Sequence, residues 1–123
     1  MLAPIAYGLA VVLALLVTFI GARFLISPRP AAAGYGVPAK PDGDAAYLEI
    51  KGLRDLTFGI LGLALIAFAD AQAAGWYMLV VAIAPLGDTL IVLRHGGTKA
   101  VAFGIHFATA VAVLISAALL FAV

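Results

Sequence analysis

Two ionisable residues, Asp88 and His106, stand inside otherwise apolar stretches of this sequence. A carboxylic acid and an imidazole can exchange protons with a substrate near neutral pH, as acid–base isomerases and cyclases require. An ionised side chain within a membrane span costs about 2.5–3.5 kcal/mol on insertion scales, so such a residue is a functional candidate by default. We therefore take Asp88 and His106 as the candidate catalytic residues.

A second set of polar residues would supply contacts to a ligand. This set is Arg23, Tyr47, Lys51, Arg54, Asp55, Arg94 and His95. The members between positions 47 and 55 lie at spacings of four, seven and eight from the first, which places them on one face of a helix.

Metal and cofactor sites are not expected. The chain has no cysteine, and a metal site would need Asp55, Asp88 and His106 to converge. His95 is expected at a helix end and His106 about 10 Å deeper by helical rise, which disfavours their ligating one haem iron. We predict no metal and no cofactor.

The composition indicates the environment that must hold these residues. Of 123 residues, 66% are hydrophobic and 11% are charged, and the mean hydropathy is +1.21. Soluble domains are about 45–50% apolar and about 25% charged. A net charge of +1 with seven basic residues excludes a broad basic surface for nucleic acid. The chain is expected to be one integral membrane domain.

Four apolar segments are long enough to cross a bilayer, which takes roughly 20 residues of helix. They are residues 2–26, 47–69, 74–93 and 100–123. Residues 27–46 contain several prolines and glycines, which predicts a loop without helix. The other two connections are short, so we predict an all-α, four-helix up-and-down bundle.

The distribution of basic residues predicts the orientation. All seven lie in or beside the first and third connections: Arg23, Arg29, Lys40, Lys51, Arg54, Arg94 and Lys99. The positive-inside rule then makes residues 27–46 a cytoplasmic loop and places both termini outside.

Asp88 and His106 are expected to meet in this bundle. Asp88 lies six residues before Arg94, and His106 lies seven residues after Lys99. At 1.5 Å per residue both would sit roughly 9–10 Å below the cytoplasmic surface, on neighbouring helices. Pro85 removes a backbone hydrogen bond beside Asp88 and is expected to kink the helix. The sequence thus predicts a polar pocket in the cytoplasmic half that binds or transforms a small lipophilic molecule.

Two alternatives stay open at this point. Asp88 would instead form a buried salt bridge with Arg54 or Arg23 in a structural or accessory subunit. Its docking surface for a partner or a second copy would be a ridge of small residues at every fourth position: Ala100, Gly104, Ala108, Ala112 and Ser116. A transporter is the minor alternative, because no inverted repeat is evident and the first span lacks an acidic residue.

Several motifs resemble one family. They are Ile20-Gly21-Ala22-Arg23-Phe24, Ser27-Pro28, Tyr35-Gly36-Val37-Pro38, Asp44-Ala45-Ala46-Tyr47, Lys51-Gly52-Leu53-Arg54-Asp55, Pro85-Leu86-Gly87-Asp88 and Arg94-His95-Gly96-Gly97. The chain is similar to small four-helix membrane proteins of unknown function found in bacteria and fungi, whose plan is similar to DoxX-like proteins. The resemblance implies a four-helix membrane bundle and supplies no catalytic residues. We expect the membrane to be the bacterial cytoplasmic (inner) membrane.

Overall fold

All the regular structure of the described residues is helical, as expected for an all-α protein. The computed structural model describes residues 1–40, 43 and 45–123. Its elements are α1 (Leu2–Ile26), α2 (Pro28–Tyr35), α3 (Ala46–Phe68), α4 (Ala71–Val81), α5 (Ile83–Arg94), α6 (Lys99–Val101), the π-helix η1 (Ala102–Phe107) and α7 (Ala108–Ala122).

Three helical stretches are long and apolar enough to cross a membrane by length and composition. They are Leu2–Ile26, Ala71–Arg94 and Lys99–Ala122. Helix α3 is also long, with 23 residues. It differs from the other three in the charges of its N-terminal half, which are Glu49, Lys51, Arg54 and Asp55.

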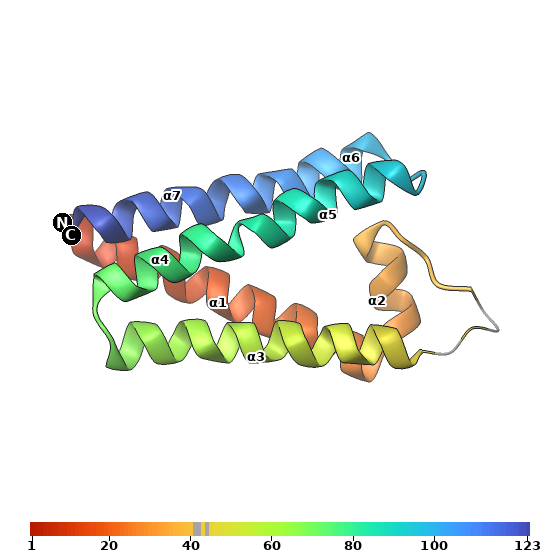
Figure 1. The fold of residues 1–123 in the computed structure, drawn as a ribbon, viewed down its shortest axis with the longest axis horizontal. Coiled ribbons are helices and arrows are strands. Elements are labelled where there is room, and N and C mark those ends of the chain that lie inside the picture. Colours follow the sequence, from red (N-terminus) through yellow and green to blue (C-terminus); the bar gives the residue numbers. More distant parts are fainter. Residues whose placement is uncertain (41–42, 44) are drawn as a thin grey trace.

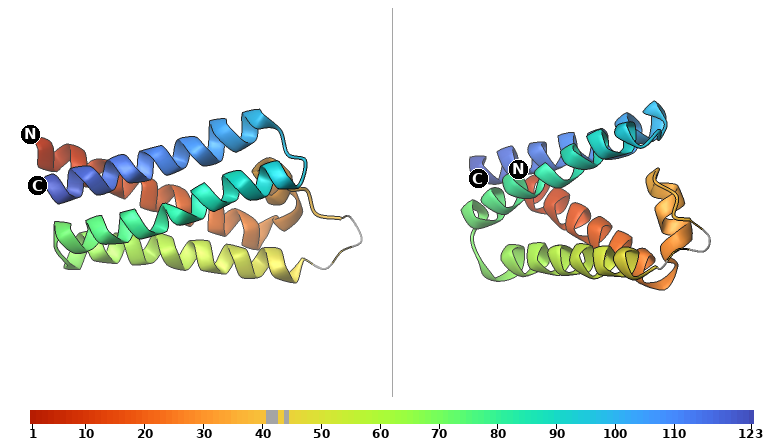
Figure 2. Two further views of the ribbon diagram at one scale, coloured as in Figure 1. Left: turned by 45° about the horizontal axis from the view of Figure 1, so that its top comes forward. Right: turned by 45° about the vertical axis from the view of Figure 1, so that its right-hand side comes forward.

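The long helices form two pairs (Figure 1). Helices α1 and α3 lie side by side, and the α4–α5 stretch packs against the stretch from α6 to α7. The two pairs diverge away from the end that holds both termini, and the short helix α2 lies across the space between them at the other end (Figure 2).

Helices α1 and α3 make the most extensive contact, which depends on glycine. A Cβ atom built on Gly21 would lie 2.3 Å from the backbone nitrogen of Leu56, and one built on Gly52 would lie 2.7 Å from the carbonyl oxygen of Gly21. A Cβ on Gly59 would meet Thr18 Oγ1 at 1.9 Å. Residues with no side chain thus allow the two backbones to touch, as is common between membrane helices.

Alanine dominates the core near the termini. The buried cluster there is Ala6, Ala10, Ala74, Met78, Ala82, Val113, Ala117 and Leu120. The second buried cluster lies at the opposite end and joins α1 to α2 through Phe24, Ala31 and Ala32. Two tight clusters therefore hold the ends of the molecule, and less tightly packed space remains between them.

The expectation that residues 27–46 lack helix is wrong for α2. Pro28 and Pro30 lie in its first turn, where backbone N–H groups have no partner within the helix, so proline removes no bond there. The helix ends at Gly36, whose φ of 99° is readily adopted only by glycine. Residues 41, 42 and 44 of the predicted loop lie outside the described residues.

The predicted distortion near Pro85 is present. The helix is interrupted at Ala82, between α4 and α5. Pro85 has no N–H for the carbonyl of Val81, four residues earlier, which accounts for the interruption.

A second distortion, η1, was not predicted from the sequence. Six residues of the last span, Ala102–Phe107, are π-helical, and the wider turn changes the register of the span. Of the predicted small-residue ridge, Ala100, Gly104 and Ala108 are exposed, Ala112 is half-buried and Ser116 is buried.

Candidate functional site

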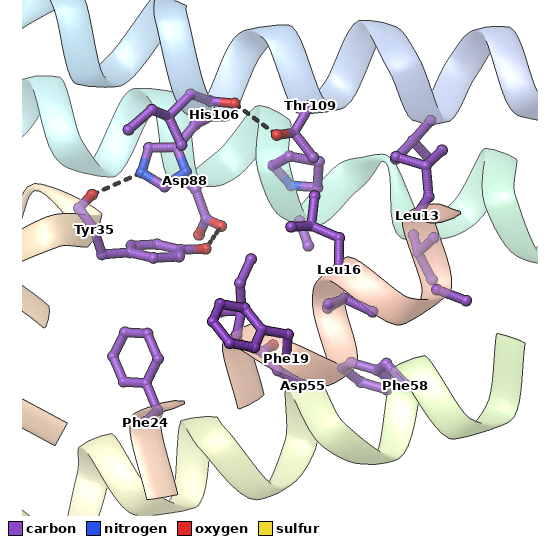
Figure 3. Close-up of a pocket in the computed structure, with 18 of the residues that line it drawn as sticks. Leu13, Leu16, Phe19, Phe24, Tyr35, Asp55, Phe58, Asp88, His106 and Thr109 are labelled. Atoms are coloured by element: carbon purple, nitrogen blue, oxygen red, sulfur yellow. Dashed lines mark hydrogen bonds between the residues drawn. The ribbon is translucent and has the colours of Figure 1, made fainter. Parts of the chain in front are cut away.

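A cavity of about 270 Å³ lies between the two helix pairs. Most of its wall is apolar: Leu13, Leu16, Val17, Phe19, Ile20, Phe24, Phe58, Met78, Val81, Ile105 and Val113. Its polar members are Arg23, Tyr35, Asp55, Tyr77, Asp88, His106 and Thr109 (Figure 3). Every long helix contributes to the wall, and α2 closes the end where most of the polar groups lie.

Tyr35 joins the two candidate catalytic residues. Its hydroxyl donates a hydrogen bond to Oδ2 of Asp88, and its main-chain carbonyl lies 2.7 Å from Nε2 of His106. Figure 3 shows the ring of Tyr35 reaching from α2 toward Asp88 on α5, with His106 of η1 beside it. The structure therefore brings Asp88 and His106 to one cavity, connected through a third residue.

The contact with the carbonyl determines the tautomer of His106. A carbonyl oxygen only accepts hydrogen bonds, so Nε2 must carry the proton. Nδ1 is then the basic nitrogen of the neutral ring. His106 is only 3% exposed, and it lies in η1, a helix type found often at functional sites.

The ring of Tyr35 is held from three sides. Nζ of Lys51 lies 4.1 Å from its centroid, within cation–π range. The Phe24 ring meets it edge-on at 5.5 Å, and the His106 ring lies at 4.2 Å. Lys51 also forms an ion pair with Asp55, one helical turn away, at 2.5 Å. Contacts from α1, α3, α5 and η1 thus fix the end of α2.

A shallower depression adjoins the cavity between α3 and α5. It is lined by Tyr35, Tyr47, Ile50, Lys51, Arg54, Asp55, Phe58, Ala84 and Asp88. Five of these residues also line the cavity: Tyr35, Asp55, Phe58, Ala84 and Asp88. The depression therefore continues the cavity toward the surrounding medium.

The predicted ligand-binding residues separate into three places. Arg23 and Asp55 line the cavity, and Tyr47, Lys51 and Arg54 line the depression. Arg94 and His95 are exposed at the end of α5 and line neither. Within the described residues, no group of three His, Asp or Glu side chains is placed to hold a metal.

Comparison with known proteins identifies the family. The family model described as a domain of unknown function (DUF4267) matches residues 14–120, which include parts of α1 and α7 and every element between them. The chain belongs to the DUF4267 family. No curated protein and no solved structure matches it.

Tyr35 is a residue of this DUF4267 site that the sequence did not mark as a candidate. It lies in a segment interpreted as loop, and an uncharged phenol carries no electrostatic signal. Two features pointed to it: the run Ala31-Ala32-Ala33 favours helix, and Tyr35 precedes Gly36, a residue type that commonly ends helices. Together they would have placed an aromatic residue at the end of a short helix.

The phenol of Tyr35 is expected to make stability depend on pH in alkaline solution. Burial, and next the Asp88 carboxylate, raise the pKa of Tyr35 above its ordinary value of 10.0. Above that pH the unfolded chain releases a proton that the folded protein keeps, so stability falls as the pH rises. Unfolding in detergent at about pH 9 and about pH 11 should show this fall. The fall should be smaller in Tyr35→Phe, and an equal fall would contradict the assignment.

Proposed function

We propose that this DUF4267 protein is a four-helix membrane protein that binds a small lipophilic molecule with one polar head. In this proposal α3 crosses the bilayer with the three apolar spans, both termini lie outside, and the membrane is the bacterial cytoplasmic membrane. The end of the molecule that holds α2 carries the basic residues, which supports a cytoplasmic position for that end.

The observation that carries the proposal is the composition of the cavity wall. Eleven large apolar side chains surround a space that ends on the Tyr35, Asp88 and His106 cluster. Small-molecule sites typically have this form, with mostly apolar walls and a few convergent polar groups. Between helices of a bundle such a site is common.

The depression between α3 and α5 supports entry from the side. A lipophilic molecule dissolves in the bilayer and reaches the protein there. Tyr35, Asp55, Phe58, Ala84 and Asp88 line both spaces, so a molecule entering through the depression arrives directly at the polar cluster. If the bound molecule is also transformed, Nδ1 of His106 and the Asp88 carboxylate are the groups for acid–base catalysis.

The test is to identify what copurifies with the protein in native lipid particles. Ala84→Trp should obstruct both the cavity and the depression, because Ala84 lines both. Ala118→Trp is the matched control, since Ala118 is exposed on α7 and lines neither. Mass spectrometry of small molecules should find the same lipophilic compound enriched with wild type and Ala118→Trp, and at least about tenfold less with Ala84→Trp.

Two results would count against the proposal. One is wild-type protein with no compound enriched above the bulk lipids. The other is equal enrichment in Ala84→Trp. Stoichiometric copurification of another protein, without a small molecule, would favour the accessory-subunit alternative.

A further inference from the structure

Each hydroxyl group of the cavity wall already donates a hydrogen bond within the protein. The hydroxyl-bearing residues of the wall are Tyr35, Tyr77 and Thr109. Tyr35 donates to Asp88, and Tyr77 donates to the carbonyl of Phe58. Thr109 donates to the carbonyl of Ile105 at 2.6 Å. A ligand head that needs a hydrogen-bond donor therefore finds none among these groups.

Two acceptor atoms remain available at the polar end. Tyr35 occupies Oδ2 of Asp88, which leaves Oδ1. His106 uses Nε2 toward Tyr35, which leaves the lone pair of Nδ1. Among the described residues, Ser116 Oγ is the only fully buried side-chain polar atom without a partner. The free atoms of Asp88 and His106 are therefore not sealed inside the protein and keep contact with open space.

The cations near the cavity do not change the excess of hydrogen-bond acceptors over donors in its interior. Lys51 is paired with Asp55 at 2.5 Å, so the two charges largely offset each other. Arg23 lines the cavity but is exposed, which places its guanidinium group at the rim. The interior thus offers acceptors, among them one carboxylate without a cation, Asp88, and it holds no unpaired cation.

We propose that the ligand of this cavity has a hydrogen-bond-donating head, an alcohol or an amine, on an apolar body. The proposal rests on the proposed function, because it assigns the head group of the same ligand. The O–H of an alcohol donates to Oδ1 of Asp88 or to Nδ1 of His106, and an amine has enough N–H groups to donate to both. A carboxylate head would bring a second negative charge to Asp88, and an ether or ester would leave both acceptors unpaired.

Four probes with the same ten-carbon chain test this assignment: decanol, decylamine, decanoate and decyl methyl ether. Binding to the full chain in lipid nanodiscs is measured by native mass spectrometry and normalised to each probe's partition into protein-free nanodiscs. A hydrogen bond to a charged group is worth roughly a tenfold change in affinity or more. Decanol and decylamine should therefore bind roughly tenfold or more tightly than the other two.

Asp88→Asn removes the charge and turns one acceptor into a donor. In this variant the preference for decanol and decylamine should largely disappear. Asp70→Asn is the matched control. Asp70 caps α4 at the opposite end of the molecule, where its side chain accepts from the Ala73 N–H, and asparagine caps a helix about as well as aspartate. If Asp88→Asn fails to fold, the four-probe series on wild type decides alone.

Decanoate or the ether binding to wild type as tightly as decanol would overturn the donor-head assignment. So would strong decanoate binding that Arg23→Gln abolishes, because the rim cation would then select the head. Suppose that either of these two results is obtained and that Ala84→Trp blocks binding of all four probes. The proposal of a lipophilic cavity then stands, and only the assignment of the head group fails. Absence of binding by every probe, together with no copurifying compound, overturns both.

Discussion

Gly21→Ala is expected to destabilise the protein by at least about 2–3 kcal/mol. The added methyl group would meet the backbone of α3, which cannot move aside as a flexible side chain could. The new Cβ would lie 2.3 Å from the nitrogen and 2.9 Å from the Cα of Leu56, and 2.6 Å from the carbonyl oxygen of Gly52. All three atoms belong to the backbone of α3, so α1 and α3 must separate along their length. The measurement is the unfolding midpoint in detergent, followed by circular dichroism.

Gly8→Ala provides the control on the same helix. No atom beyond the local helix lies within 4 Å of a Cβ built there. In that setting alanine is neutral or stabilises a helix by up to about 1 kcal/mol over glycine. Equal stability of Gly21→Ala and Gly8→Ala would show that the two helices do not approach as closely as described.

Tyr35→Phe is expected to cost about 1.5–3 kcal/mol of stability, the range for a hydrogen bond to a charged group. The change keeps the ring, and with it the contacts to Lys51 at 4.1 Å and to Phe24 at 5.5 Å. It removes only the hydroxyl that donates to Asp88, whose carboxylate is left without that donor. Hydrogen exchange of the α2 amides should accelerate together with the loss of stability, since Asp88 is one of the groups that hold α2.

Tyr47→Phe is the matched control, because Tyr47 is 82% exposed. It should change neither quantity. A double variant, Tyr35→Phe with Asp88→Leu, removes both partners and should recover much of the lost stability, because no carboxylate then lacks a donor. A Tyr35→Phe variant with wild-type stability and wild-type exchange would exclude Tyr35 as the residue that holds Asp88.

The apolar pattern of the chain was sufficient to predict the long helices, but local distortions were not visible in it. The segments predicted at residues 2–26 and 47–69 differ by no more than one residue at either end from Leu2–Ile26 and Ala46–Phe68. The density of proline and glycine after Ser27 predicted a loop where α2 lies. Proline disrupts a helix only beyond its first turn, and the number of prolines alone does not show which of them lie in a first turn. The π-helix η1 has no marker of its own, since its residues are as apolar as the α-helices around them.

The meeting of Asp88 and His106 could be predicted because depth follows from residue number along a helix. What connects them could not be predicted in this way. Tyr35 comes from the segment between α1 and α3, and its position depends on the packing of α2 against α1 through Phe24 and Ala31. Charge alone suggested a salt bridge from Asp88 to Arg54 or Arg23. In the structure Asp88 instead accepts a hydrogen bond from the phenol of Tyr35.

The bond between His106 and the carbonyl of Tyr35 has a consequence for how position 35 tolerates substitution. Every amino acid carries that carbonyl, so any residue that preserves α2 can hold the imidazole, whereas only a hydroxyl-bearing one of tyrosine's length can reach Asp88. In a saturation library at position 35, most substitutions should therefore free the Asp88 carboxylate while His106 keeps its hydrogen bond to the main chain. Substitutions at Gly36, whose φ of 99° ends α2, should release His106 by moving the main chain. The imidazole is thus controlled by residues that shape the backbone and the carboxylate by a side chain.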